Sequence, residues 1–89
     1  MRAIISVVGN DRPGIMAKVS TQCAQNNVNI VDISQTVLQD MFTMIMICEI
    51  EKSADEFKEF VTHMETEGKN SGLSIHVMHE DIFNAMHKI

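Results

Sequence analysis

The apolar residues of this chain follow two periodicities whose order along the sequence leaves very few possible topologies. A period of two residues, or a short run rich in Val and Ile, is typical of strands, and a spacing of three and four residues is typical of an amphipathic helix. Strand patterns cover Ala3–Gly9, Val28–Leu38, Met41–Ile50 and Leu73–His79. Helical patterns begin at Ile15, after Ser53, and near Asp81 as a short helix of about 81–88. The predicted order is therefore β-α-β-β-α-β plus a C-terminal helix.

Local signals set the expected ends of these elements. Pro13 suits the first turn of the first helix, and Asn26 and Asn27 can adopt the left-handed conformation that ends it. Ser53 and Glu56 have the spacing of a capping box at the start of the second helix. We expect residues 68–72 (GKNSG) to form a loop and Asp81 to cap the last helix.

Right-handed crossovers around both main helices favour one arrangement of these elements. It is an α+β, ferredoxin-like sandwich with an antiparallel sheet of strand order 4-1-3-2, and we expect residues 1–89 to form this single domain. Strands two and four are then the edges of the sheet. Both main helices cover one face, so the other face is bare unless the C-terminal helix or a second subunit covers it.

Apolar residues occur on both sides of the segment 41–50, which predicts a central strand with something covering each side of the sheet. We expect Met44, Met46 and Met78 to belong to the core, although methionine also adapts to varied partner surfaces. The candidate cover for the bare face is the stripe of Ile82, Phe83, Met86 and Ile89.

The composition of the chain limits the classes of ligand and partner that we expect. The 89 residues have a net charge of −5, no Trp or Tyr for base stacking and no basic cluster, so we expect no nucleic acid ligand. The apolar runs are too short to span a membrane, and no secretory signal pattern is present, which predicts a cytoplasmic protein. Cys23 and Cys48 each lie in an apolar pattern, so we expect buried free thiols. A chain of this size gains stability from burial between subunits, which favours a homo-oligomer.

The turn Asn10–Gly14 (NDRPG) is the candidate binding element. First-turn amides of Gly14, Ile15 and Met16, together with the positive end of the helix dipole, would attract a carboxylate or phosphate. Gly14 would let a ligand approach the backbone. An alternative is that Asp11 caps the helix and the other residues only shape the turn.

The segments VVGNDRPGIMAKVS and NNVNIVDISQTV resemble the ACT domain, a small-molecule-binding regulatory module. The resemblance covers Met1 to about His79 and is closest to small stand-alone ACT proteins and to each half of the tandem-ACT regulator of glycine cleavage genes. It implies that an amino acid or a similar small ligand binds at a dimer interface. The loop after strand one, the start of helix one and strand two of the neighbouring subunit would form the site.

Carried over to this sequence, the resemblance assigns a role to each part of the site. Asn10 and Asp11 would contact the polar groups of the ligand, while the amides of Ile15 and Met16 would receive its carboxylate. Asp32 is the candidate ammonium partner, with a solvated edge residue as the alternative. The full set of candidate ligand-binding residues is Asn10, Asp11, Arg12, Gly14, Ile15, Met16, Asn29, Ile30, Val31 and Asp32.

Enzyme chemistry has little support in the sequence. Acylphosphatases share the ferredoxin-like fold and use an Arg and an Asn, for which Arg12, Asn10 and Asn29 are the counterparts, but this chain lacks their glycine-rich cradle. The spacing of the Ser, Cys and His residues does not indicate a catalytic nucleophile. The spacing of the four histidines does not indicate a metal site, so we expect no catalytic residue, metal or cofactor.

The resulting hypothesis is a non-catalytic, homodimeric ACT-like domain that binds a small ligand, with an amino acid as the expected class. Because no catalytic or DNA-binding domain accompanies it within these 89 residues, occupancy would act on a separate regulated protein. The alternative from another class is a protein–protein interaction module without a ligand.

Overall fold

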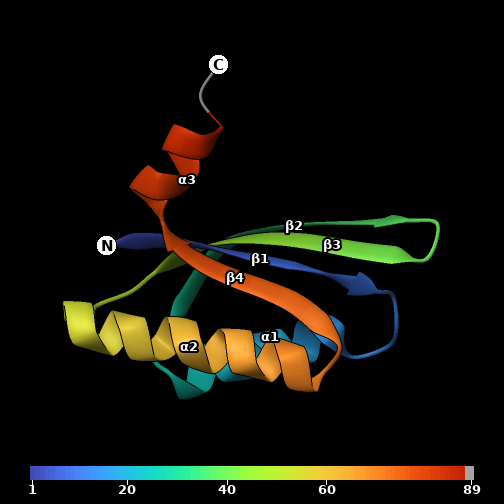
Figure 1. The fold of residues 1–89 in the computed structure, drawn as a ribbon, viewed down its shortest axis with the longest axis horizontal. Helices are drawn as coiled ribbons and strands as arrows, with labels where there is room; N and C mark the ends of the chain where they lie inside the picture. Colours follow the sequence, from blue (N-terminus) through green and yellow to red (C-terminus); the bar gives the residue numbers. More distant parts are fainter. Residues whose placement is uncertain (88–89) are drawn as a thin grey trace.

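The computed structural model describes residues 1–87 and has the predicted order of elements (Figure 1). Four strands alternate with two long helices and are followed by a short third helix. The elements are β1 (Arg2–Asn10), α1 (Ile15–Gln25), β2 (Asn29–Leu38), β3 (Met41–Glu49), α2 (Ala54–Asn70), β4 (Leu73–His79) and α3 (Glu80–Met86).

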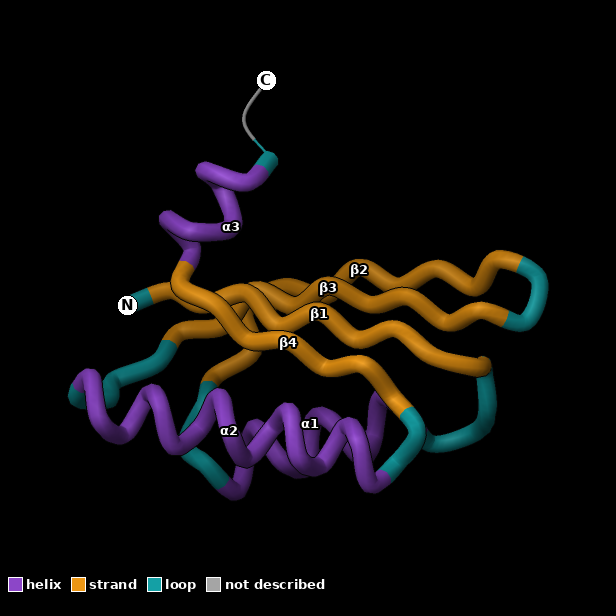
Figure 2. Tube along the Cα trace, viewed as in Figure 1, coloured by secondary structure: helices purple, strands orange, loops and turns teal. Residues whose placement is uncertain are grey.

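The four strands form one antiparallel sheet of order β2-β3-β1-β4, which confirms the predicted ferredoxin-like topology. Helices α1 and α2 lie side by side on one face of this sheet, and α3 stands at the opposite face (Figure 2). β2 and β4 are the edge strands, as expected. The C-terminal end of β1 pairs with the N-terminal end of β3, so Asn10 lies opposite Met41.

The hydrophobic core lies between the sheet and the two long helices. On β3, the side chains of Phe42, Met44, Met46 and Cys48 alternate with exposed or half-buried ones and point into this core. The core is completed from the other elements by Ala3, Ile5, Val7, Ile15, Val19, Cys23, Val28, Ile50, Phe60, Met64, Leu73, Ile75 and Val77. Cys23 and Cys48 are buried and free, which confirms that prediction.

β3 is a central strand, as predicted, but within one chain its second side is covered only in part, and cover by a second subunit stays a prediction. Ile45 points away from the core and is 39% exposed, because this face of the sheet has no long helix over it. Met78 also lies on this second face and is half-buried, so it is not part of the core with Met44 and Met46.

Helix α1 begins differently from the expectation. Gly14 is its N-cap residue, in the left-handed conformation with φ +88°, and no side chain accepts a hydrogen bond at this end. The alternative in which Asp11 caps the helix is therefore wrong. Pro13 lies in the turn before the helix rather than in its first turn. At the other end, Asn27 has φ +58°, which confirms the left-handed residue expected there.

Helix α2 has the predicted capping box. The Glu56 backbone N–H donates to Ser53 Oγ at 3.2 Å, and the Ser53 backbone N–H donates to Glu56 Oε1 at 2.9 Å. These hydrogen bonds stabilise the charged form of Glu56 and lower its pKa.

The expected loop at 68–72 is wrong in its first half, because α2 continues to Asn70. Gly68 is buried where the helix crosses β4, and a Cβ there would lie 2.9 Å from the Leu73 carbonyl oxygen. The glycine therefore serves close helix–sheet packing and does not end the helix.

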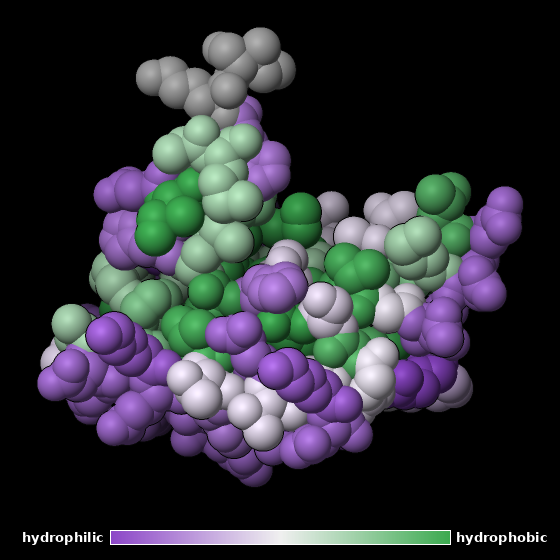
Figure 3. Space-filling model, viewed as in Figure 1, coloured by the Kyte–Doolittle hydropathy of each residue, from purple (hydrophilic) through white to green (hydrophobic). Residues whose placement is uncertain are grey.

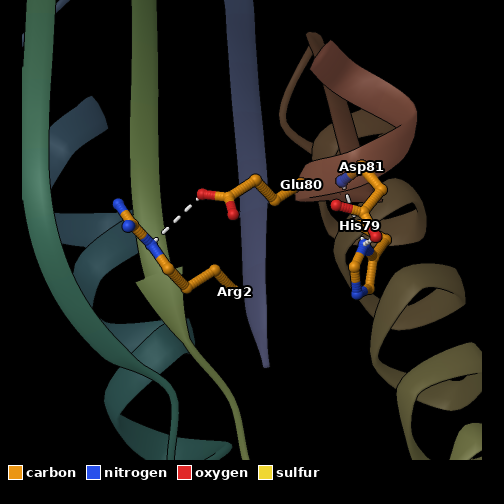
Figure 4. A network of polar contacts seen from close by, with 4 residues as sticks. All are labelled: Arg2, His79, Glu80 and Asp81. Atoms are coloured by element: carbon orange, nitrogen blue, oxygen red, sulfur yellow. Dashed lines mark hydrogen bonds and ion pairs between the residues drawn. The ribbon is translucent and has the colours of Figure 1, made fainter. Parts of the chain in front are cut away.

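Helix α3 begins at Glu80, and its N-cap is His79, whose Nδ1 accepts a hydrogen bond from the Asp81 backbone N–H at 3.0 Å. The expected cap at Asp81 is therefore two residues too late. An ion pair of 3.2 Å between Arg2 and Glu80 ties the start of α3 to β1 (Figure 4). The predicted contribution of Ile89, and the predicted helix end at 88, lie outside the described residues.

Helix α3 covers only part of the second face. Ile82 and Met86 of its apolar stripe are 56% and 65% exposed, and only Phe83 is half-buried. Among residues 1–87, no helix is both long enough and apolar enough to cross a membrane.

Candidate functional site

The loop between β1 and α1 is held in place by backbone contacts at both of its ends. The backbone N–H of Asp11 donates to the carbonyl of Asp40 at 2.7 Å, which ties the loop to the β2–β3 turn. The backbone N–H of Lys18 donates to the Gly14 carbonyl at 2.9 Å and closes the first turn of α1. The loop and the β2–β3 turn thus lie together at one end of the molecule, opposite the N-terminus (Figure 1).

The N-terminal end of α1 is open in the way an anion site requires. A Cβ built on Gly14 would meet no atom within 4 Å, so the space above this backbone is free. No side chain caps the helix, and its first turn contains no acidic residue to neutralise the dipole. The side chain of Ile15 is buried and Met16 is 36% exposed, which leaves backbone amides as the polar groups of this turn.

Arg12 is turned toward the turn between α2 and β4. Its Nη2 donates to the Ser71 carbonyl oxygen, and its Nη1 lies 3.9 Å from where a Cβ on Gly72 would be. The guanidinium therefore connects the β1–α1 loop to the α2–β4 turn and does not lie at the start of α1. Nothing in the described contacts brings Arg12 to Asn29, so the pair needed for the acylphosphatase alternative is not assembled within one chain.

The second half of the candidate site lies on β2. The register of β2 against β3 shifts between Ile30 and Asp32, so Val31 is the extra residue of a β-bulge and is 51% exposed. Asp32 is exposed, and its Oδ1 accepts the Ile33 backbone N–H at 2.9 Å. Bulges re-aim side chains on edge strands, and here the bulge directs Asp32 to the same face as its β3 partner Ile47.

A single chain does not bring the two halves together. Asn10 lies opposite Met41 at one end of β3, and Asn29 lies opposite Glu49 at the other end. Eight residue steps along β3 amount to about 27 Å at the usual rise of a strand. Asn10, Asp11, Gly14, Ile15 and Met16 therefore form one cluster, with Arg12 turned aside, and Asn29, Ile30, Val31 and Asp32 form another.

Two further residues belong to these clusters. Asp40 positions the loop through its carbonyl, and the two-residue gap between the strands predicted at 28–38 and 41–50 was the signal that could have found it. Glu49 lines a hollow of about 450 Å³ beside the strand cluster, with Met1, Asn27, Asn29 and Glu51. Its pairing with Asn29 follows from the register of β2 on β3, which the sequence does not fix.

The two clusters differ in the polar groups they offer, although the loop cluster also contains the exposed carboxylate of Asp11. The loop cluster offers backbone N–H donors and the positive end of a helix dipole, and the strand cluster offers the carboxylates of Asp32 and Glu49. Residues 1–87 hold no group of three His, Cys, Asp or Glu side chains placed to bind a metal ion. The arrangement therefore favours binding of a small polar molecule.

Comparison with known proteins agrees with the fold and the sequence motifs. The ACT domain family model matches residues 2–78. A UPF0237 protein from Listeria innocua is 46% identical over 89 residues, which cover all of both chains. Among solved structures, an ACT domain protein from Streptococcus pneumoniae has a TM-score of 0.82 and 40% identity, and the match covers 98% of each chain.

A putative glycine cleavage system transcriptional repressor has a TM-score of 0.74 and 26% identity. The match covers 86% of this chain and 44% of that one, as expected if one domain of the longer protein is similar to this fold. The family match over nearly the whole chain and the close relatives of equal length leave one assignment: the chain belongs to the ACT domain family.

Proposed function

We propose that this protein is a homodimeric regulatory module that binds an amino acid at a site shared between two chains. The observation that carries the proposal is the separation of a donor-rich loop cluster and an acidic strand cluster at opposite ends of β3. Membership of the ACT family, whose members are typically regulatory and ligand-binding, supports it.

A twofold pairing of β2 edges would complete the site. β2 is an edge strand whose outer backbone groups have no partner strand within the described chain, and such edges pair readily with another copy. In an antiparallel pair of β2 strands, the Asn29 end of one copy lies beside the Leu38 end of the other. Leu38 is opposite Met41, next to the loop cluster, so the partner's strand cluster comes to the loop cluster.

The polar groups of the completed site fit a ligand that carries both a positive and a negative charge. The ligand carboxylate binds the amides at the start of α1, where the helix dipole adds roughly 0.3–2 kcal/mol. We assign the ammonium to Asp32 of the other chain, whose exposed carboxylate makes no ion pair within residues 1–87. Because Asp32 lies on the face of the sheet opposite α1, the ligand on this account extends past the sheet from the start of α1 to this carboxylate. Both groups occur together in a free amino acid, which is the ligand class that this pair of clusters fits.

A ligand that contacts both chains gives this protein a means of regulation. A ligand held by two chains favours the dimer over the separate chains, and such coupling is typically about 1–3 kcal/mol. A separate protein that distinguishes the two states would receive the signal. On this account the domain is non-catalytic and acts in the cytoplasm, where free amino acids are its ligands.

A thermal-shift screen against the free amino acids tests this function. A ligand at ten times its Kd stabilises the folded state by about 1.4 kcal/mol, which raises the Tm of a domain of this size by several degrees. Gly14→Val is expected to abolish the rise, because its side chain occupies the open space above the helix start.

The matched control is Gly72→Val. Gly72 also has a positive φ, +70°, so valine causes similar backbone strain there. This position lies at the α2–β4 turn, where the nearest side chain is Arg12, which is turned away from the start of α1. The control is expected to keep the ligand-induced shift despite a lower starting Tm. A flat screen of a protein that still forms a stable dimer would overturn amino acid binding and favour the interaction module.

A further inference from the structure

The second face of the sheet carries almost no charge. Antiparallel pairing places residues of neighbouring strands on one face in rows, and the central rows here are uncharged. The members of these two rows are Ser6, Ser34, Ile45 and His76, and Val8, Thr36, Thr43 and Ser74. The next row, with Ile4, Ile47 and Met78, ends at Asp32. Charged side chains occur on this face only at one end, where Arg2, Asp32 and Glu49 lie.

This depletion is local and not a property of the whole chain. Charged residues make up 21% of the sequence, and the outward side of α2 carries several of them. A loss of charge in the centre of a patch, rather than overall apolarity, is what distinguishes the middle of a protein–protein interface from ordinary surface.

Helix α3 adds a wall to this face. A groove of about 480 Å³ lies between the helix and the sheet, with Val8, Ile45 and Met78 on the sheet side and Phe83 and Met86 on the helix side. Figure 3 shows apolar patches on the projecting helix and over the sheet beside it, with more polar residues between them. Ile82 does not line the groove and is 56% exposed, so α3 presents apolar side chains away from its own sheet as well.

We propose that a second copy of this chain docks on this face, with α3 of each copy lying against the sheet of the other. The face is self-complementary in shape, since it holds both a projecting apolar helix and a groove beside it. It is self-complementary in charge too. Two copies that each carry a net charge of −5 repel one another, and the two uncharged rows allow close approach at the centre of this face. Its acidic groups, Asp32 and Glu49 on the sheet and Glu80 and Asp81 at the start of α3, lie toward one end.

The available area suits this occupant. Four strands about 4.8 Å apart and about eight residues long give a footprint of roughly 500 Å², and one flank of α3 adds about 100 Å². Two copies would then bury at most roughly 1,200 Å², because α3 already covers part of the sheet, and this value is the lower limit of stable interfaces between proteins. A small molecule in the groove would leave most of this face uncovered.

This interface lies on the face of the sheet and goes beyond the proposed function, which uses the β2 edge. The two can coexist, because edge pairing extends the sheet sideways and leaves its second face open. Two edge-paired dimers joined through their faces would form a tetramer with twofold symmetry.

Sedimentation equilibrium of the full chain and of Ile45→Glu tests the proposal. Glutamate at this half-exposed position places a like charge in both halves of the interface, and we expect the assembly mass to fall two-fold. Met86→Glu is a second variant with the same expected fall, and its 65% exposure means that the fold does not depend on it. Thr66→Glu, on the exposed side of α2, adds the same charge elsewhere and should leave the mass unchanged.

Three outcomes would overturn the inference. They are a wild-type protein that stays monomeric at millimolar concentration, an Ile45→Glu variant with wild-type mass, and an equal fall in mass for Thr66→Glu. If Ile45→Glu instead keeps its mass but loses binding of an apolar dye, the face is a small-molecule site. Because the two-fold fall is read relative to the wild type, failure of edge pairing or of amino acid binding does not affect this result.

Discussion

Replacing Met44 by alanine is expected to lower the free energy of unfolding by about 2–5 kcal/mol. Met44 lies on the central strand β3, is 0% exposed, and pairs with Val7 on one side and Gln35 on the other. Truncation leaves a cavity that the sheet and the packed helices fill only in part, so the transfer and cavity costs add. This is a large fraction of the 5–15 kcal/mol typical of a small domain.

Urea denaturation of Met44→Ala beside Met41→Ala measures this effect. Met41 is on the same strand and is 46% exposed, so its truncation should cost less than about 0.5 kcal/mol. Both variants are compared with the wild type at one protein concentration, because self-association makes stability depend on concentration. Equal costs for the two methionines would show that the assigned core face of β3 is wrong.

Proline substitutions in β2 are expected to remove edge pairing completely. In an antiparallel strand, the backbone N–H groups of neighbouring residues point to opposite sides. Of Ser34 and Gln35, both in register with β3, one therefore faces β3 and the other faces the open edge. Proline is tolerated at the edge-facing position but breaks the sheet at the other.

Ser34→Pro and Gln35→Pro are made as separate variants, and the one that still folds marks the residue whose N–H faces the open edge. The variant that keeps the wild-type far-ultraviolet circular dichroism is expected to show half the wild-type mass in sedimentation and no thermal shift with amino acids. The other variant is expected to unfold. A folded proline variant that keeps both its mass and its thermal shift would show that the chains do not meet along β2.

Much of the fold could be predicted because each element has a local signal. The alternation at Leu73, Ile75 and Val77 and the capping box at Ser53 specify their elements without reference to distant residues. Right-handed crossovers then leave few ways to order the strands.

The errors arose where tertiary contacts outweigh local preference. Gly68 has the lowest helix propensity short of proline, yet it lies inside α2, because only a glycine lets the helix approach the Leu73 carbonyl. Asp11 has an ideal capping side chain, but the hydrogen bond of its backbone to Asp40 fixes the turn elsewhere. The cap of α3 was misplaced because strand and helix meet at His79 without a loop.

The candidate site could be predicted as two segments but not as one place. Motifs at Asn10–Gly14 and Asn29–Asp32 indicate both segments. The sequence pattern of one chain does not say which residues of a second chain lie beside its edge strand. The turned-aside Arg12 shows the same limit, since its contact with Ser71 depends on the end of α2.

Mixing two defective variants tests most directly whether the site is shared between chains. Gly14→Val damages the loop cluster and Asp32→Ala damages the strand cluster, so each homodimer is expected to bind no ligand. A mixed dimer has one site with both defects and one intact site. After equimolar mixing and re-association, titration calorimetry with the amino acid that gave the largest thermal shift should find about one quarter of the wild-type number of sites. No recovery of binding in the mixture would contradict a site built from two chains.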